Sequence, residues 1–174
     1  NVTSMESMFE NSHYNQELFD INLHKFQNIP RHIANTDMSG LEIGTTKWSG
    51  GVLAPNGKIY AMPFNSTNVL IIDPETNETN TTSITGLSGT NKWSGGVLAP
   101  NGKIYGIPHN SSSVLIIDPS AGTADTTTIT GIIGTAKYIG GVLAPNGKIY
   151  AIPLRAPNVL IIDPETNTTD ITSI

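Results

Sequence analysis

Short apolar runs separated by turn-forming residues dominate the chain after residue 46. Each run has four or five residues, as β-strands commonly do, and none has the spacing of an amphipathic helix. The third run is apolar at every position, which is typical of a strand buried on both faces. We therefore predict four strands at the start of this pattern, at residues 51–54, 58–62, 69–72 and 81–85.

The connections between these runs contain the residues that tight turns require. Asn-Gly at 56–57 separates the first two runs, and its glycine supplies the positive φ of a tight hairpin. Asp73 and the proline after it follow the third run, where the Asp side chain can bond the next backbone amides. We therefore interpret Asp73, and the equivalent Asp118 and Asp163, as turn formers rather than acids or calcium ligands.

The whole pattern repeats with a period of 45 residues. Residues 47–60 return unchanged at 92–105, and again at 137–150 with only Tyr138 and Ile139 altered. Tandem repetition at this period indicates a chain built from repeated supersecondary units. The copies span residues 47–91, 92–136 and 137–174.

Four antiparallel strands in about 40 to 50 residues, repeated in tandem, are the layout of β-propeller blades. The copies resemble the blades of YVTN, NHL and kelch propellers over residues 35–174, through the stretches Gly-Val-Leu-Ala, Asn-Gly-Lys-Ile-Tyr and Val-Leu-Ile-Ile-Asp-Pro. The resemblance implies that the glycine-led first strand lines a central channel, where the small pair Gly50-Gly51 fits a crowded position. We predict an all-β propeller section with three visible four-stranded antiparallel blades.

The number of blades is unusual. Propellers typically close with about four to eight blades, and an open arc of three would leave two apolar sheet faces bare. Either a longer chain carries further blades, or two copies join head to tail into a ring, so that a homo-oligomer is expected. Aligned by the period, residues 37–41 are predicted to form a preceding fourth strand. Ile174 falls on the predicted strand position of Ile84 and Ile129.

Residues 1–34 precede the repeat and have a different pattern. Residues 3–6 have the form of a capping box, and Met5, Met8 and Phe9 fall on one helical face, which predicts a short helix. About sixteen residues also resemble the Val-Thr-x-Met-x-x-Met-Phe repeats of BspA-like surface leucine-rich proteins. This resemblance implies the end of a leucine-rich region and favours an extracellular or particle-surface location.

Composition narrows the possible partners. The 174 residues carry 9 Lys and Arg against 14 Asp and Glu, a net charge of −5. Domains that bind nucleic acids or anionic membranes normally present a basic surface, so we expect neither partner. No apolar run approaches the roughly 20 residues that span a bilayer, so membrane insertion is not expected. There are no cysteines, and no two histidines have a metal-binding spacing, so we predict no metal and no cofactor.

Strand polarity predicts which loops share one face of the blades. The loop after each second strand lies at the same end as the crossing to the next blade, and propellers commonly bind ligands on this face. Aromatic rings beside Lys and Asn can stack on a sugar and bond its hydroxyls. The candidate ligand-binding residues are Lys47, Trp48, Lys92, Trp93, Lys137, Tyr138, Phe64, His109 and Arg155.

Both features of this loop face have a structural alternative. The repeated aromatic residues can instead pack between adjacent blades. Two adjacent loop positions differ among otherwise copied units, which marks either partner specificity or a lack of constraint. These positions hold Phe64, His109 and Leu154, followed by Asn65, Asn110 and Arg155.

Asn-x-Ser/Thr sequons recur in the predicted turns and loops. In a eukaryotic secreted protein they would accept glycans, although a chain rich in Asn, Thr and Ser also produces sequons by chance. The glycosylation candidates are Asn65, Asn77, Asn80, Asn110 and Asn167, with a further sequon at Asn1.

The chain carries no serine-hydrolase motif, no phosphate-binding glycine loop and no adjacent pair of carboxylates. We therefore predict a non-enzymatic recognition module that binds a glycan or a protein through its loop face. The alternative is a structural protein whose blades pair with copies of itself or with a coat or surface layer. A third hypothesis is that the chain is part of a propeller enzyme whose site is assembled from several blades.

Overall fold

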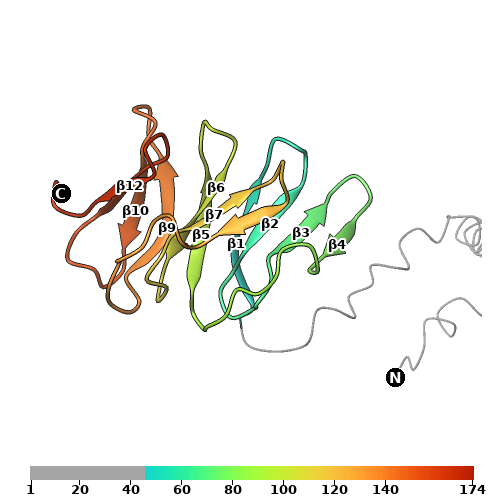
Figure 1. Cartoon of the computed structure of the whole chain (residues 1–174), viewed down its shortest axis with the longest axis horizontal. Coiled ribbons are helices and arrows are strands. Elements are labelled where there is room, and N and C mark those ends of the chain that lie inside the picture. Colours follow the sequence, from blue (N-terminus) through green and yellow to red (C-terminus); the bar gives the residue numbers. More distant parts are fainter. Residues whose placement is uncertain (1–45) are drawn as a thin grey trace, which may run out of the picture. The chain divides into compact units, whose positions relative to one another are not determined.

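The computed structural model describes residues 46–174, which form three four-stranded sheets and, within that range, no helix (Figure 1). Blade 1 consists of β1 (Trp48–Leu53), β2 (Ile59–Pro63), β3 (Leu70–Asp73) and β4 (Glu78–Asn80). Blade 2 consists of β5 (Trp93–Leu98), β6 (Ile104–Pro108), β7 (Leu115–Asp118) and β8 (Thr123–Asp125). Blade 3 consists of β9 (Tyr138–Leu143), β10 (Ile149–Pro153), β11 (Leu160–Asp163) and β12 (Thr168–Asp170).

Each sheet is an antiparallel meander in sequence order, which confirms the predicted all-β fold and blade layout. Neighbouring pairs hold the copied residues in one register, with Tyr60 opposite both Val52 and Ile71. The first three strands of each blade lie where the sequence predicts them, although the first begins earlier, at Trp48 in blade 1. The predictions for residues 1–34 and for a strand at 37–41 lie outside the described residues.

The predicted fourth strand at 81–85 is wrong. The fourth strand is β4, which ends at Asn80, because the Asn80 side chain accepts hydrogen bonds from the backbone N–H groups of Thr82 and Ser83. Such an Asx turn directs the chain out of the sheet. Ile84 then lies in a loop and accepts a single backbone bond from Val69, as Ile174 does from Val159, so Ile174 is not a strand residue either.

The first strands of the three blades lie next to one another, and glycines allow this close approach. A Cβ added to Gly50 would lie 2.9 Å from the Cα of Gly95, and one added to Gly95 would lie 3.0 Å from the Cα of Gly140. Both glycines also have positive φ, near a register shift at the start of each first strand. The prediction that the glycine pair occupies a crowded position is confirmed.

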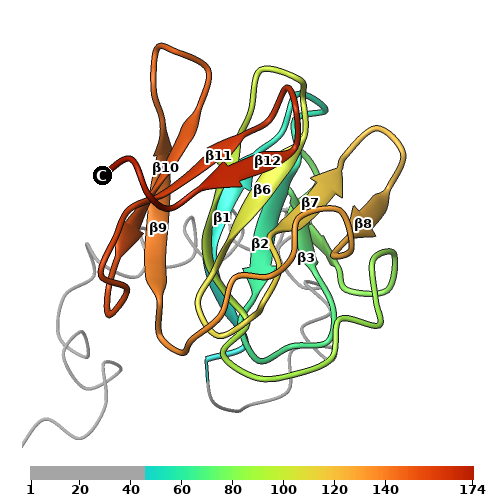
Figure 2. The same cartoon turned by 60° about the vertical axis from the view of Figure 1, so that its left-hand side comes forward.

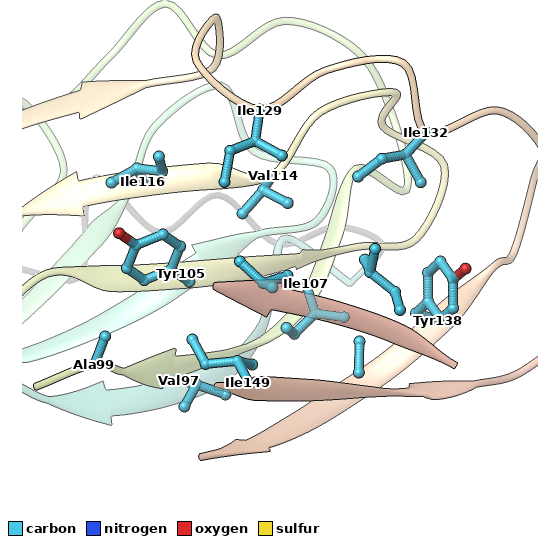
Figure 3. Packing of buried hydrophobic residues seen from close by; sticks show 13 residues of the cluster. Val97, Ala99, Tyr105, Ile107, Val114, Ile116, Ile129, Ile132, Tyr138 and Ile149 are labelled. Atoms are coloured by element: carbon cyan, nitrogen blue, oxygen red, sulfur yellow. The ribbon is translucent and has the colours of Figure 1, made fainter. Parts of the chain in front are cut away.

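The hydrophobic core lies between the blades rather than within one of them. One cluster joins blades 1 and 2, where Met62 of β2 packs with Trp93 and Ile104. A second cluster joins blades 2 and 3, where Ile107 and Tyr105 of β6 pack with side chains that include Ile149 (Figure 3). Each sheet therefore depends on its neighbour for burial.

Candidate functional site

A continuous series of backbone hydrogen bonds connects the loops at one end of all three blades. We call the loops after the second strands, residues 64–68, 109–113 and 154–158, the rim. The bonds alternate between a rim residue and the lysine at the start of a blade, within and across blade boundaries. They join Lys47, Phe64, Lys92, His109, Lys137 and Leu154 in that order, with N···O distances of 2.7–3.0 Å. The predicted gathering of these loops on one face is thus observed.

Two of the candidate lysines anchor this series and are buried. The ammonium of Lys92 donates to the carbonyls of Ser66 and Gly89 at 2.8 Å and of Phe64 at 3.3 Å. Lys137 likewise donates to the carbonyls of Ser111 and Gly134 at 2.9 Å. Burial lowers the pKa of both lysines below the usual 10.5. Their donors are committed to the protein itself, so the expectation that Lys92 and Lys137 face a ligand is corrected.

The aromatic residues after these lysines pack between blades, which is the alternative weighed from the sequence. Trp93 and Tyr138 are buried, and Trp93 donates its Nε1–H to the Ser113 carbonyl at 2.8 Å. The Lys92 ammonium also lies 5.8 Å from the Trp93 ring centroid. Burial raises the pKa of the Tyr138 hydroxyl. Neither ring has a free face on which a sugar could stack, so the assignment of Trp93 and Tyr138 to ligand binding is corrected as well.

Blade 1 repeats this arrangement with less burial. Trp48 donates its Nε1–H to the Asn68 carbonyl at 2.8 Å, and the Lys47 ammonium lies 5.9 Å from the Trp48 ring centroid. Both residues are only half-buried. They occupy the same position in the repeat as the buried Lys92 and Trp93. The difference in burial therefore reflects their place on the face of blade 1 that points away from blade 2, which we call its outer face.

The residues that vary among the copies do come together on the rim. The Phe64 and His109 rings meet edge to face with their centroids 5.2 Å apart. Leu154 occupies the third equivalent position and is half exposed, and Arg155 beside it is exposed. Two half-buried rings, an exposed aliphatic side chain and an exposed guanidinium group give the rim both apolar and charged contact surface.

Sequence reasoning missed the role of two rim asparagines. Asn65 accepts a bond from the Asn91 backbone N–H at 2.8 Å, and Asn110 accepts one from Ala136 at 2.7 Å, each across a blade boundary. Asn91 and Ala136 have φ near 50°, so these side chains support a left-handed backbone. The only signal in the sequence was that two copies share this Asn. Arg155, which replaces it in blade 3, has no acceptor to offer.

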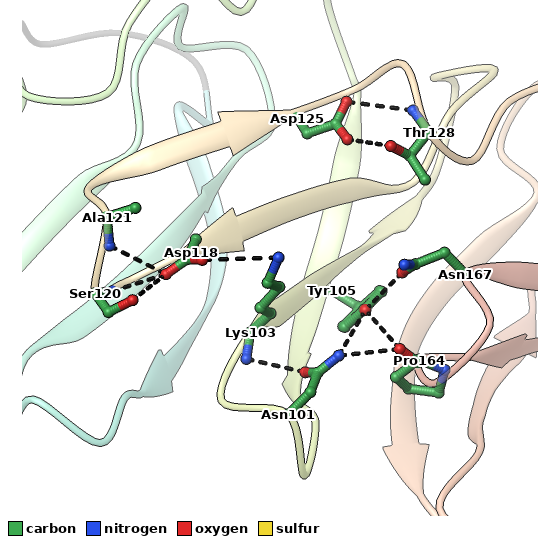
Figure 4. A network of polar contacts seen from close by, with 10 residues as sticks. All are labelled: Asn101, Lys103, Tyr105, Asp118, Ser120, Ala121, Asp125, Thr128, Pro164 and Asn167. Carbon is green, nitrogen blue, oxygen red and sulfur yellow. Dashed lines mark hydrogen bonds and ion pairs between the residues drawn. The ribbon is translucent and has the colours of Figure 1, made fainter.

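Of the other sequons, Asn77 and Asn167 lie in turns, as predicted, whereas Asn80 is the last residue of β4. Asn77 and Asn167 are exposed and have φ values of 58° and 53°, which asparagine adopts readily. Asn167 also accepts a bond from the Tyr105 hydroxyl at 2.8 Å, in the network that joins blades 2 and 3 (Figure 4). Glycosylation at these asparagines, at Asn80 and at the rim asparagines stays a prediction.

The repeated aspartates form turns, as predicted. Asp73 accepts the Glu75 backbone N–H at 3.0 Å and pairs with the Lys58 ammonium at 2.9 Å. The hydrogen bond from Lys58 lowers the pKa of Asp73, and one from Ser120 lowers that of Asp118. These partners assign the aspartates to the turns between the third and fourth strands.

A small polar cavity lies at the opposite end of the blades from the rim. Lys103, Asp118 and Asp125 of blade 2 and Asn167 of blade 3 contribute to its lining (Figure 4). Its volume of about 130 Å³ is well below the roughly 300–1,000 Å³ of typical small-molecule sites. Its charged groups already contact one another, with 3.7 Å between Lys103 and Asp118. We therefore treat the rim as the candidate site.

Residues 46–174 hold no group of three or more His, Asp or Glu side chains placed to bind one metal ion. The same stretch also lacks a helix of the length and apolar character needed to cross a bilayer.

Comparison with known proteins identifies the fold but no family. No family profile matches the chain, and neither does any curated protein sequence. Solved structures do match. Virginiamycin B lyase from Staphylococcus aureus aligns with a TM-score of 0.54 at 13% identity, over 70% of this chain and 39% of the lyase.

Other matching structures have different activities in their names. An auxiliary nutrient-binding protein from Bacteroides ovatus aligns with a TM-score of 0.52 at 17% identity, over 73% of this chain and 32% of that protein. Kuenenia stuttgartiensis hydrazine synthase aligns with a TM-score of 0.55 at 14% identity, over 75% of this chain and 36% of that one. The chain thus spans well under half the length of these proteins. Identities this low establish a shared propeller-type fold and nothing about activity.

Proposed function

We propose that this propeller section is a non-enzymatic recognition module that binds a protein or a glycan at the rim. One observation supports the proposal above all. Phe64, His109 and Leu154, which differ among the copies, lie on one hydrogen-bonded series that crosses all three blades, and the rings of Phe64 and His109 meet edge to face. A rigid backbone that carries variable side chains is a suitable design for specific binding.

The chemistry of the rim favours a protein ligand over a glycan. Of the rings that would stack on a sugar, Trp93 and Tyr138 are buried between blades and Trp48 is half-buried. The rim instead offers Phe64, Leu154 and Arg155, and aromatic and arginine side chains are enriched at the centres of protein interfaces. The nutrient-binding protein among the structural neighbours is compatible with a binding role for such a fold.

The test uses two defined probes, a phage-displayed peptide library and a glycan array. Ligands enriched on the wild-type protein are measured again with Phe64→Ala and Arg155→Ala. Both substitutions are expected to weaken binding at least about tenfold, as loss of an interface anchor does. Glu165→Ala, an exposed change in the turn after β11, is the matched control and should bind as the wild type does.

Three results would contradict the proposal. Equal binding by the rim variants would place the ligand elsewhere, and no enriched ligand from either library would remove the support for recognition. A stoichiometric metal or cofactor in the purified protein, detected by elemental analysis and absorption spectra, would favour the propeller enzyme instead.

A further inference from the structure

We propose that the outer face of blade 3 binds the outer face of blade 1 in a second copy of this chain, head to tail. This surface is distinct from the rim, and the inference does not depend on the proposed function. It rests on internal repetition, because the two interfaces inside the chain show what normally covers each face.

The face of blade 2 that contacts blade 3 is equivalent to the outer face of blade 3, which points away from blade 2. Equivalent side chains on these two faces differ sharply in burial. Val97 and Ile107 of blade 2 are 8% and 0% exposed, because blade 3 covers them. Their equivalents in blade 3, Val142 and Ile152, are 62% and 48% exposed. Ile174 is 64% exposed. Blade 3 therefore presents the same apolar surface that its neighbour presents, without a covering blade among residues 46–174 (Figure 2).

Blade 1 presents the complementary surface. Leu53 is 61% exposed, and Trp48 is half-buried although its equivalent Trp93 is buried. Residues 47–60 of blade 1 are identical to 92–105 of blade 2, which already form one such interface. The outer face of blade 1 therefore has the side chains that the end of blade 3 requires.

The glycines show how the two faces fit. A Cβ on Gly96 would lie 3.0 Å from Sδ of Met62 in the preceding blade, and one on Gly141 would lie 2.9 Å from Cδ1 of Ile107. Gly51 is the equivalent position in blade 1, and among the described residues its Cβ would meet only its own blade, at Ile59. The exposed Ile152 is the equivalent of Met62 and Ile107, so Gly51 of the second copy is the position it would fill.

Polar groups at the opposite end support the same pairing. Asn101 of blade 2 donates its amide N–H to the Pro164 carbonyl of blade 3 at 3.0 Å, and Asn56 donates to Pro119 at 3.4 Å. In blade 3 the equivalent Asn146 is already held by a 3.0 Å bond to the Tyr150 hydroxyl. Pro74 is the equivalent of Pro119 and Pro164, so we expect the Pro74 carbonyl of the second copy to accept the hydrogen bond from Asn146.

A second copy is the occupant because one chain carries both complementary faces. Two different faces make a heterologous contact, which either closes into a ring or grows into an open filament. Two copies of the three blades at residues 46–174 give six, which lies within the range of about four to eight that closes a propeller. We call each contact between blade 3 of one copy and blade 1 of the other a seam. Arg155 replaces the bridging Asn in blade 3, so each seam lacks the bond from a backbone N–H to an Asn side chain that the internal interfaces have. The seams are therefore expected to be weaker than the internal interfaces.

The test is the absolute mass of the whole chain by light scattering after size-exclusion chromatography. The wild type is expected at twice the 18.5 kDa chain mass. Ile152→Asp and Leu53→Asp each place a carboxylate in both seams and should give the monomer mass. Ile133→Asp is the matched control, because Ile133 is also exposed but lies in the crossing between blades 2 and 3, and it should remain a dimer.

Mixing the two disrupted variants tests the head-to-tail geometry. The Ile152→Asp chain keeps an intact blade 1 face and the Leu53→Asp chain keeps an intact blade 3 face, so the mixture should recover a dimer through one seam. A monomeric wild type, a dimer that survives both substitutions, a larger open assembly or a mixture that stays monomeric would each overturn the proposal. Circular dichroism of each variant confirms that loss of mass is not loss of fold.

Discussion

The copied positions and the varied positions of the repeat lie in different environments. Lys92, Trp93 and Gly95 belong to the copied sequence, and they occupy the boundary between blades 1 and 2. Phe64 and His109 differ between copies and lie together on the rim. In a repeat protein each unit must fit the next one, so interface positions keep their apolar character, as in the changes from Trp93 to Tyr138 and from Met62 to Ile107, whereas rim positions change in charge and shape. Repetition within one chain therefore separates structural residues from candidate binding residues.

The largest expected effect is at Trp93. Trp93→Ala removes a buried ring that packs between two blades and donates a hydrogen bond to Ser113, so the free energy of unfolding should fall by about 3–5 kcal/mol. Trp48→Ala removes the same ring and the same bond at the outer face, where less of the ring is buried, and should cost less. Urea unfolding of both variants in the monomeric Ile152→Asp background, which leaves the outer face of blade 1 uncovered, measures the difference. Equal losses would contradict the assignment of Trp93 to inter-blade packing.

A smaller effect is expected at the inner glycines. Gly95→Ala and Gly140→Ala both force a side chain into positive φ, at a cost of about 1–2 kcal/mol each. Only the Cβ at position 95 would also collide with the next blade, since none of the described atoms lies within 4 Å of one at 140. In the monomeric Ile152→Asp background, where no second copy covers Gly140, thermal unfolding of Gly95→Ala should therefore show the larger loss. If Gly140→Ala were equally or more destabilised, the close approach of the first strands would not limit stability.

The smallest effect is expected at the end of β8 and depends on pH. Hydrogen bonds from Thr128 and Thr127 lower the pKa of Asp125 to about 2 from 3.8. A lowered folded-state pKa gives stability that is present above pH 3.8 and is lost as the pH falls through about 2. Asn80 makes the same turn in blade 1, so Asp125→Asn should keep the turn and lose only the charge-dependent part of this stability at pH 7.

The free energies of unfolding of the wild type and of the single variant Asp125→Asn, measured at pH 7 and at pH 2.5, check this prediction. Asp125→Asn should lose less stability on acidification than the wild type, because a group that no longer titrates cannot contribute to the loss. An unchanged difference between the two pH values would show that the Asp125 turn does not contribute to acid sensitivity.

Much of the fold could be predicted because the same pattern of apolar runs and turn residues occurs three times in the chain. Apolar runs and Asn-Gly or Asp-Pro turns located three strands of each blade, and strand polarity placed the loops on one face. The fourth strand was misplaced because residues 81–85 look like a strand, whereas Asn80 ends the strand by bonding the backbone after it. A side chain that competes with the sheet for backbone groups is not visible in hydrophobic periodicity.

The candidate site was harder to predict, because burial depends on neighbours far away in sequence. A lysine is normally exposed, and Lys92 is buried only because carbonyls of Ser66 and Gly89 converge on its ammonium. No local pattern indicates that convergence. The varied residues Phe64, His109 and Arg155 could be found by comparing the copies, and the structure places them where the loops meet.

The most direct test of this division of roles exchanges rim residues between blades and measures the free energy of unfolding. Leu154→His combined with Arg155→Asn gives blade 3 the residues of blade 2 at two exposed positions. The double variant should remain within about 0.5 kcal/mol of the wild type, as exposed substitutions usually do. A loss of several kcal/mol, comparable to that of Trp93→Ala, would show that the varied rim holds the blades together and would contradict the account.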